Sequence, residues 1–212
     1  MLRIHEIFHS LQGESSRVGL PTVFVRLTGC PMRCVYCDTE YAFKGGRNMP
    51  LDEIMEQVAS YGARYVCVTG GEPLAQKKNC LELLRRLCDA GYEVSLETGG
   101  AVSTEGVDAR VAVILDIKTP GSGELANNHW DNLTRLKSND EIKIVLCGRE
   151  DYEWARQLLA EHALTEKCPV IFSPVYSHLK PADLADWVLE DKLPVRMQVQ
   201  LHKILWGETP GK

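Results

Sequence analysis

The chain has 212 residues, of which 44% are hydrophobic and 25% charged, ordinary proportions for a globular protein with a full core. Its 24 Lys and Arg against 29 Asp and Glu give a net charge of -5, which offers no broad attraction to nucleic acid, because that affinity comes largely from neutralised phosphates. The N-terminus lacks an apolar signal region and no run of about 18 apolar residues occurs, so we expect neither export nor a membrane span.

The chain contains eight cysteines. Without an export signal we expect a cytoplasmic protein in a reducing compartment, where clustered thiols more often bind metal or carry out redox chemistry than form disulfides. Five cysteines stand singly in apolar surroundings, and we expect them to pack as small hydrophobic side chains. These five are Cys67, Cys80, Cys88, Cys147 and Cys168.

Strand and helix patterns alternate along the chain. Short apolar runs rich in β-branched residues predict strands at Thr22–Thr28, Arg64–Thr69, Glu93–Thr98, Val111–Ile117, Glu141–Leu146, Pro169–Ser173 and Val195–Gln200. Apolar residues spaced three and four apart predict helices at Leu51–Tyr61, around Leu81–Cys88, near Tyr152–His162 and near Ala182–Glu190. The segment Pro120–Asn132 is weakly patterned and favours a loop.

Strands that alternate with helices over short connections indicate a mainly parallel sheet with helices packed on it. The strands are nearly all apolar, as expected where both faces of a sheet are covered. Six or seven units can be counted, whereas a complete eight-unit barrel typically needs about 250 residues. We therefore predict an α/β fold, a trimmed and incomplete TIM-type β/α barrel, in a single domain over residues 1–212.

In parallel β/α folds the chemistry lies at the carboxyl ends of the strands. Polar and glycine residues follow most of the predicted strands, and we expect these strand ends to form the site. They are Gly29 with the cysteines beyond it, Gly70–Pro73, Glu97–Gly100, Asp116–Lys118 and Ser173–Pro174.

Cys30, Cys34 and Cys37 form a Cx3CxxC cluster. A structural zinc site would need a fourth ligand, and a catalytic zinc held only by thiolates would be a poor Lewis acid. A cubane iron–sulfur cluster favours thiolate, and three thiolates would leave one iron open to a small molecule. Spacing alone favours the cluster but leaves zinc open, with a fourth ligand from His5, His9 or His202.

Tyr36 before the last cysteine and the downstream GGEP at Gly70–Pro73 complete a pattern that resembles the radical S-adenosylmethionine superfamily. The resemblance implies a [4Fe-4S] cluster on the three cysteines, whose fourth iron binds S-adenosyl-L-methionine and whose reduction yields a 5′-deoxyadenosyl radical. It also implies cofactor contacts beside the cluster, at the GGEP turn, near the ribose and carboxylate, and near the adenine. In that order they are Tyr36 and Asp38, Gly71 and Glu72, Asp116 and Lys118, and Ser173, Pro174 and Val175.

A narrower resemblance runs over nearly the whole chain. The segments FHSLQGES, GLPTVFVRLTGC, CDTEYAF, LDIKTP, FSPV and QLHK are similar to the 7-carboxy-7-deazaguanine synthase family. This implies ring contraction of 6-carboxy-5,6,7,8-tetrahydropterin to 7-carboxy-7-deazaguanine with loss of ammonia, a carbon–nitrogen lyase reaction of queuosine and 7-deazapurine biosynthesis. It also implies a homodimer that is reduced by flavodoxin or a similar protein.

The implied pterin substrate has neighbouring N–H donors, which one carboxylate can accept side by side. Glu14 is the candidate, with a loop salt bridge as the alternative. Arg26 lies in an apolar strand and needs an anion, either the substrate carboxylate or an internal Asp or Glu. His202 resembles a substrate-contacting position, although a lone histidine is more often structural. The other implied contacts are Leu11, Gln12, Gly13 and Thr69.

Three further features bear on the assignment. Thr39 matches a position where family members bind Mg²⁺, an ion that prefers oxygen ligands, with a turn cap as the alternative. Ser15 stands where many relatives carry glycine, so we expect a differently shaped loop, and a substrate contact by the C-terminal Lys212 remains open. The rival functions are a glycyl-radical activating enzyme, which the LQGE and QLHK segments disfavour, and a zinc-stapled binding module without turnover.

Overall fold

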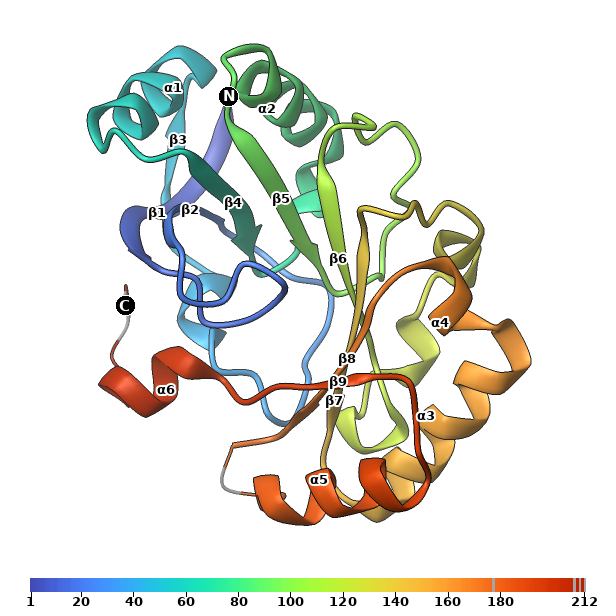
Figure 1. The fold of residues 1–212 in the computed structure, drawn as a ribbon. Coiled ribbons are helices and arrows are strands. Elements are labelled where there is room, and N and C mark those ends of the chain that lie inside the picture. The colour runs from blue at the N-terminus through green and yellow to red at the C-terminus, as the bar shows by residue number, and fades with distance from the viewer. Residues whose placement is uncertain (177, 208, 210, 212) are drawn as a thin grey trace.

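The computed structural model describes residues 1–176, 178–207, 209 and 211, so Lys212 lies outside the described residues. Within them, nine strands form one sheet in the order β3-β1-β2-β4-β5-β6-β7-β8-β9 (Figure 1). The strands from β2 to β9 run parallel, whereas β1 pairs antiparallel with both β2 and β3. Because β3 and β9 end the order without pairing to each other, the fold is an open, partial β/α barrel, as predicted.

The elements have the following bounds. The strands are β1 (Leu2–Leu11), β2 (Pro21–Leu27), β3 (Arg47–Met49), β4 (Tyr65–Gly70), β5 (Glu93–Thr98), β6 (Ala112–Ile117), β7 (Glu141–Leu146), β8 (Val170–Pro174) and β9 (Arg196–Met197). The α-helices are α1 (Leu51–Ser60), α2 (Lys77–Asp89), α3 (Arg149–His162), α4 (Leu164–Lys167), α5 (Pro181–Glu190) and α6 (Leu201–Trp206). Short 3₁₀ turns lie at Glu40–Phe43, Pro73–Gln76, Pro120–Ser122, Leu125–Asn127 and Trp130–Thr134.

The predicted elements match β2, β4 to β8, α1, α2, α3 and α5 within a few residues. The weakly patterned segment after β6 forms 3₁₀ turns and no α-helix, in line with the predicted loop. The strand predicted at Val195–Gln200 is wrong in extent, because β9 covers only two residues. Beyond β9 the chain leaves the sheet and packs against the segment that follows β1. There Gln198 Nε2 donates to the Ser15 carbonyl at 3.0 Å, and Leu201 N donates to the Gly13 carbonyl at 3.0 Å.

The sequence analysis assigned no element to the N-terminus, which forms the ten-residue strand β1. A β-bulge shifts its register between Ile4 and Glu6. Because of the bulge, the core side chains Leu2, Ile4 and Ile7 do not follow the simple alternation by which a strand is read from sequence. The strand adds an antiparallel edge to an otherwise parallel sheet.

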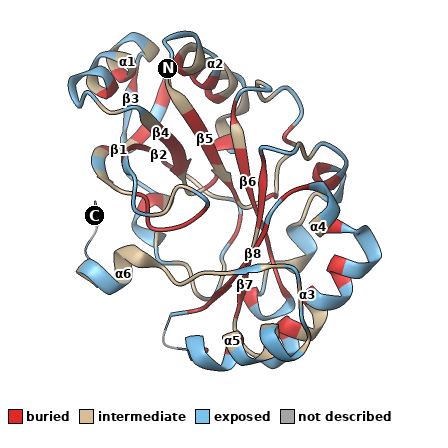
Figure 2. Ribbon diagram, in the orientation of Figure 1, coloured by how far each residue is buried: buried red, intermediate tan, exposed pale blue. Residues whose placement is uncertain are grey.

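Side chains alternate between the two faces of the parallel strands. The outer face is apolar and packs against the helices, which turn their exposed sides to solvent (Figure 2). On β2, Val23 and Val25 are fully buried in the core, whereas Phe24 and Arg26 line a cavity. The inner face is therefore mixed, with polar side chains among the apolar ones. The next four strands each send a polar side chain inward, namely Thr69, Glu97, Asp116 and Lys143.

The core consists of two apolar clusters. One joins β1 to β5 with α1 and α2, and the other joins β6 to β8 with α3 and α5. The continuous pairing of β5 with β6 connects them, and Val107 packs against both. Among the described helices, none combines the length and the apolar character that crossing a bilayer would require.

Candidate functional site

An open cavity of about 650 Å³ lies against the inner face of the sheet and its strand ends. Most of the predicted site residues line it together, although they come from widely separated segments. They are Leu11, Gln12, Gly13, Glu14, Arg26, Cys30, Cys34, Tyr36, Cys37, Asp38, Thr39, Thr69, Gly71, Asp116, Lys118, Val175 and His202. Three predicted residues are not part of this lining, namely Glu72, Ser173 and Pro174.

The cysteine loop leaves β2 at Gly29, whose φ of +98° lies in the region that favours glycine. Cys30, Cys34 and Cys37 are half-buried free thiols on this loop, and Cys37 N donates to the Cys34 carbonyl at 3.1 Å. Burial raises the pKa of all three thiols, that of Cys34 to about 11. Beside them, the buried hydroxyl of Tyr36 has no hydrogen-bond partner within the described residues.

The turn after β4 packs closely against the start of the cysteine loop. A Cβ on Gly71 would lie 2.2 Å from the carbonyl oxygen of Gly29 and 2.9 Å from the Cβ of Cys30. The Glu72 N–H donates to the same carbonyl at 2.8 Å. Glycine at position 71 therefore allows two cavity-lining loops to touch.

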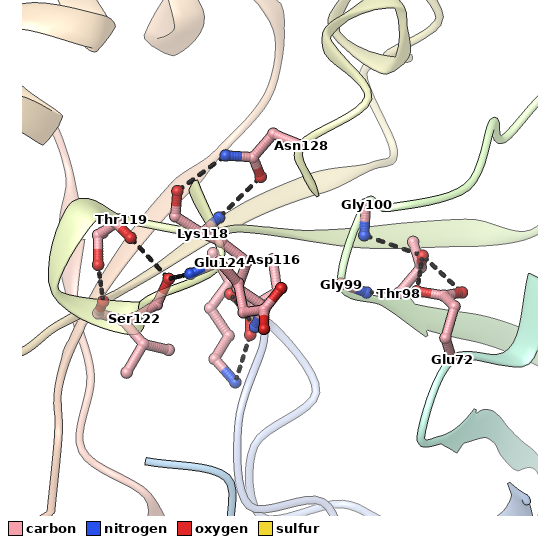
Figure 3. A network of polar contacts seen from close by, with 12 residues as sticks. Glu72, Thr98, Gly99, Gly100, Asp116, Lys118, Thr119, Ser122, Glu124 and Asn128 are labelled. Carbon is pink, nitrogen blue, oxygen red and sulfur yellow. Dashed lines mark hydrogen bonds and ion pairs between the residues drawn. The ribbon is translucent and has the colours of Figure 1, made fainter. Parts of the chain in front are cut away.

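The carboxylate of Glu72 is fully buried outside the cavity lining and reaches the end of β5 (Figure 3). It accepts hydrogen bonds from Thr98 Oγ1 at 2.8 Å, from Gly99 N at 2.9 Å and from Leu74 N at 2.9 Å. Burial raises the pKa of this carboxyl group, while the three donors act against that rise. Glu72 thus connects the ends of β4 and β5, and its backbone N–H bonds the start of the cysteine loop.

Asp116 and Lys118 lie at the end of β6. Lys118 Nζ lies 3.1 Å from Asp116 Oδ1 and 5.9 Å from the centre of the Tyr36 ring. The Asn128 side chain holds the Lys118 backbone through two bonds of 2.9 and 2.8 Å (Figure 3). Burial alone would lower the pKa of Lys118, but the Asp116 carboxylate outweighs this effect, so the pKa is raised. The ammonium is therefore charged and fixed beside the cysteine loop.

The segment after β8 is only partly available to a ligand. Ser173 is buried and its hydroxyl donates to the Gln198 carbonyl at 2.9 Å. Pro174 is buried at the end of the strand, whereas Val175 lines the cavity. Of the three residues predicted here, only Val175 lines the cavity, and Tyr176 and His178 line it beyond them.

The segment after β1 forms the other end of the cavity. The Glu14 carboxylate pairs with Lys143 Nζ through Oε2 and accepts from Gln200 Nε2 at 2.7 Å through Oε1. Gln12 Nε2 donates to Glu97 Oε1 at 3.1 Å, and Gln12 Oε1 accepts from Glu14 N at 3.3 Å. The alternative of a salt bridge is therefore realised at Glu14, yet each carboxylate oxygen keeps a further acceptor site.

Arg26 also has an internal carboxylate partner. Its Nε donates to Glu6 Oε1 at 2.7 Å, and Tyr41 Oη donates to the same oxygen at 2.9 Å. Thr69, the register neighbour of Arg26 on β4, donates through Oγ1 to Glu97 Oε2 at 2.8 Å. Arg26 and Thr69 both line the cavity in fixed orientations.

His202 on α6 and Thr39 on the cysteine loop both line the cavity. The His202 ring packs so closely on Gly13 that a Cβ there would lie 2.0 Å from Nδ1. Thr39 makes no side-chain cap on the following 3₁₀ turn, and its hydroxyl donates to Asp38 Oδ1 at 2.8 Å. Asp38 Oδ2 in turn lies 3.3 Å from Lys203 Nζ, so α6 is tied to the cysteine loop.

Comparison with known proteins agrees with this arrangement. Residues 24–119 match the family model of the Radical SAM superfamily. The 7-carboxy-7-deazaguanine synthase of Chlorobaculum tepidum is 50% identical over 97% of this chain and 94% of its own length. That of Koribacter versatilis is 45% identical over 99% of this chain and 100% of its own length. The chain belongs to the 7-carboxy-7-deazaguanine synthase family.

Two solved structures share the fold. QueE from Escherichia coli matches with a TM-score of 0.76 and 24% identity, over 95% of this chain and 94% of that one. Streptococcus suis SuiB bound to S-adenosylmethionine matches with a TM-score of 0.57 and 15% identity, over 81% of this chain and 48% of that one. At these identities the likeness shows the partial-barrel fold alone, which this synthase-family chain has with β1 and β3 added at one edge.

The donor set fits the iron–sulfur cluster that the radical SAM family carries. In the described part of the chain, no three His, Cys, Asp or Glu side chains converge as the ligands of a single metal ion. A cubane places each thiolate on a different iron, so its ligands need not meet at one point. Three thiols on one half-buried loop, with Tyr36 and Lys118 beside them in the same cavity, suit such a group.

Two cavity residues of this synthase-family chain have no role in the sequence prediction. Lys143 pairs with Glu14, and Gln200 donates to Glu14. Lys143 carries a readable signal, because a lysine inside the apolar strand EIKIVL has the same need for a counter-charge as an arginine inside TVFVRLT. Gln200 belongs to the QLHK segment, but the predicted strand Val195–Gln200 hides its contact with Glu14. Glu97, which accepts from Gln12 and Thr69, lies at one of the strand ends predicted to form the site.

Proposed function

We propose that this protein converts 6-carboxy-5,6,7,8-tetrahydropterin to 7-carboxy-7-deazaguanine. The observation that carries the proposal is the single cavity whose lining contains a three-cysteine loop and, from other segments, a carboxylate, an arginine and a histidine. The three-cysteine loop suits a radical-generating cluster. The carboxylate, the arginine and the histidine suit a compact ligand with N–H donors and a carboxylate. Family membership supports the same reaction.

At the cofactor end, Cys30, Cys34 and Cys37 would hold the [4Fe-4S] cluster. When bound, the reduced cluster would supply the electron for reductive cleavage of S-adenosyl-L-methionine, with loss of methionine, and so the radical chemistry of the reaction. The residues proposed to bind and orient the cofactor are Tyr36, Asp38, Gly71, Asp116, Lys118 and Val175. Glu72, Ser173 and Pro174, whose side chains are buried outside the cavity lining, would act through their backbone or by shaping these turns.

At the substrate end, Glu14 would accept two N–H donors of the pterin while Gln12 and the backbone of Leu11–Gly13 contact the rest of that edge. Arg26 would bind the substrate carboxylate, since its Nε bond to Glu6 holds the guanidinium against the cavity. Thr69 and His202 would contact the ring from either side. Through these contacts the protein orients the substrate and excludes side reactions.

Thr39 would supply one oxygen ligand to Mg²⁺. Its hydroxyl donates its proton to Asp38, so its lone pairs remain available to a cation. Mg²⁺ keeps several waters and needs few protein ligands, and an ion there would neutralise the substrate carboxylate. The protein would receive electrons from flavodoxin or a similar reductant and act as a homodimer.

The test is anaerobic incubation of the iron-reconstituted protein with reductant, S-adenosyl-L-methionine, Mg²⁺ and the carboxytetrahydropterin. We expect a brown protein with about four irons and formation of 7-carboxy-7-deazaguanine with ammonia. Cys34→Ala should lose both, whereas Cys147→Ala, a half-buried cysteine outside the cavity lining, should lose neither. An iron-loaded protein that forms no deazaguanine rejects the substrate, and a colourless protein with one zinc rejects the whole assignment.

A further inference from the structure

Lys143 is the inward-facing lysine of β7. Its side chain is only 14% exposed, and its Nζ pairs with Glu14 and lies 3.7 Å from Asp116 Oδ2. Asp116 is its register partner on β6, whereas Glu14 is 129 residues away in the chain. Lys143 therefore lies between Glu14 at the proposed substrate end of the cavity and Asp116 at its proposed cofactor end.

A buried ammonium or carboxylate is costly unless it is paired. Burial alone would lower the pKa of Lys143, but the carboxylates of Glu14 and Asp116 outweigh it and raise the pKa, so the lysine is charged. The pairing also holds Oε2 of the Glu14 carboxylate in place. Gln200 fixes the other oxygen of Glu14 at 2.7 Å, so the plane of the carboxylate is set from two sides.

We propose that Lys143 is a positioning residue that selects the pterin by holding the Glu14 carboxylate ready for two neighbouring N–H donors. This inference rests on the proposed function, because it assumes that Glu14 receives the pterin edge. Lys143 acts through Glu14 and contributes no bond to the substrate. Its removal should weaken substrate binding only while Glu14 is present as a carboxylate.

The test is a double-mutant cycle on substrate affinity. Calorimetric titration of the iron-loaded, unreduced protein with carboxytetrahydropterin, in the presence of S-adenosyl-L-methionine, measures Kd without turnover. Lys143→Met should raise Kd roughly tenfold, and Glu14→Gln should raise it at least as much. The double variant should bind no more weakly than Glu14→Gln alone. Lys78→Met, at an exposed position of α2, is the matched control and should leave Kd unchanged.

The outcomes separate the two proposals. A wild-type protein that does not bind the pterin overturns the proposed function and this inference with it. A wild-type protein that binds, with Lys143→Met within twofold of it or with additive effects in the double variant, overturns the inference alone. If Lys143→Met fails to load iron because it leaves two buried carboxylates underpaired, Lys143→Gln, which keeps a hydrogen-bond donor but no charge, takes its place in the cycle. A raised Kd for that variant that vanishes in the Glu14→Gln background supports the inference, and an unchanged Kd or additive effects overturn it.

Discussion

Ser15 adopts a φ of +68°, a left-handed conformation that favours glycine. The serine at this position thus adopts a backbone geometry that glycine would adopt without strain. A non-glycine residue there costs roughly 1–2 kcal/mol. The side chain is buried, and its Oγ accepts from Arg17 N at 3.2 Å.

Ser15→Gly and Ser15→Ala both delete that hydroxyl, but only glycine relieves the backbone. We therefore expect Ser15→Gly to exceed Ser15→Ala in free energy of unfolding by about 1 kcal/mol, after allowing for the greater freedom of glycine in the unfolded chain. Urea unfolding of the two variants measures the difference. An alanine variant as stable as the glycine variant would show that the position is unstrained.

Single residues show where sequence reasoning about the site works and where it stops. The glycine and cysteine positions were readable because their motif fixes which residues must converge. Arg26 was flagged by its apolar surroundings, but whether its partner was Glu6 or a ligand depended on the pairing of β1 with β2, which no local pattern encodes. The motif predicts a cofactor contact at Glu72, but motif membership does not tell that its carboxylate accepts from Thr98.

At the scale of elements, the segment between β1 and β2 is held to the starts of several strands. Glu141, the first residue of β7, accepts from the backbone N–H of Ser16 at 2.9 Å and pairs with its hydroxyl. Arg17 Nη1 donates to the Glu93 carbonyl at 3.0 Å at the start of β5. These contacts fix a segment that carries Gln12 and Glu14 into the cavity.

We expect Glu141→Ala to destabilise the fold by about 2 kcal/mol, because it removes the charged acceptor of the Ser16 N–H. The KM for the pterin should rise while the iron content stays unchanged, since the cysteine loop follows β2, whereas Glu141 begins β7. Ser16→Ala, which removes the hydroxyl but keeps the backbone donor, is the matched control and should have the smaller effect on both quantities. Equal effects of the two variants would contradict a backbone anchor.

The helix α6 reaches the cavity through close contact of His202 with Gly13. A methyl group on Gly13 would lie 2.0 Å from His202 Nδ1, so Gly13→Ala must displace the histidine or the segment. We expect a loss of about 2 kcal/mol in unfolding free energy and a raised KM for the pterin. Gly13→Ala combined with His202→Ala should regain most of the stability but not the KM. Failure of the double variant to regain stability would place the clash elsewhere.

The elements that sequence predicted well are those whose pattern is local. Helices α1 and α2 show apolar residues at helical spacing, and β2 and β4 to β8 are short apolar runs rich in β-branched residues. The strand β1 was not predicted because its bulge breaks the alternation of apolar and polar residues. The strand β9 was overextended because β-branched Val195 and Val199 cannot reveal that the chain turns away to bond with the segment after β1.

At the scale of the whole molecule, chain length and the count of units were enough to predict an open barrel. The strand-end position of the site follows from the sequence, but the polar pairings inside the cavity do not. They depend on polar side chains from five neighbouring strands and on a return of the C-terminal segment, where Gly207, Thr209 and Gly211 line the cavity wall. Long-range pairings of this kind, such as Glu14 with Lys143, leave no periodic trace in the sequence.

If the chain is a single domain, the two apolar clusters should unfold together in one cooperative transition. All four tryptophans, Trp130, Trp154, Trp187 and Trp206, lie in the C-terminal half. Tryptophan fluorescence therefore reports on the half that contains β6 to β9, while far-ultraviolet circular dichroism reports on the whole chain. The β5–β6 pairing and Val107 join the clusters, so we expect the two probes to give one coincident urea transition.

A core substitution in the N-terminal cluster makes this expectation sharper. Leu83 on α2 is fully buried in the first cluster, far in sequence from every tryptophan. Leu83→Ala should lower the unfolding free energy by about 2–5 kcal/mol and shift the fluorescence midpoint as much as the circular dichroism midpoint, because a cooperative unit loses stability everywhere at once. Leu158→Ala, in the second cluster, is the matched control. A fluorescence transition that ignores Leu83→Ala but follows Leu158→Ala would mean that the halves on either side of the β5–β6 junction fold as separate units.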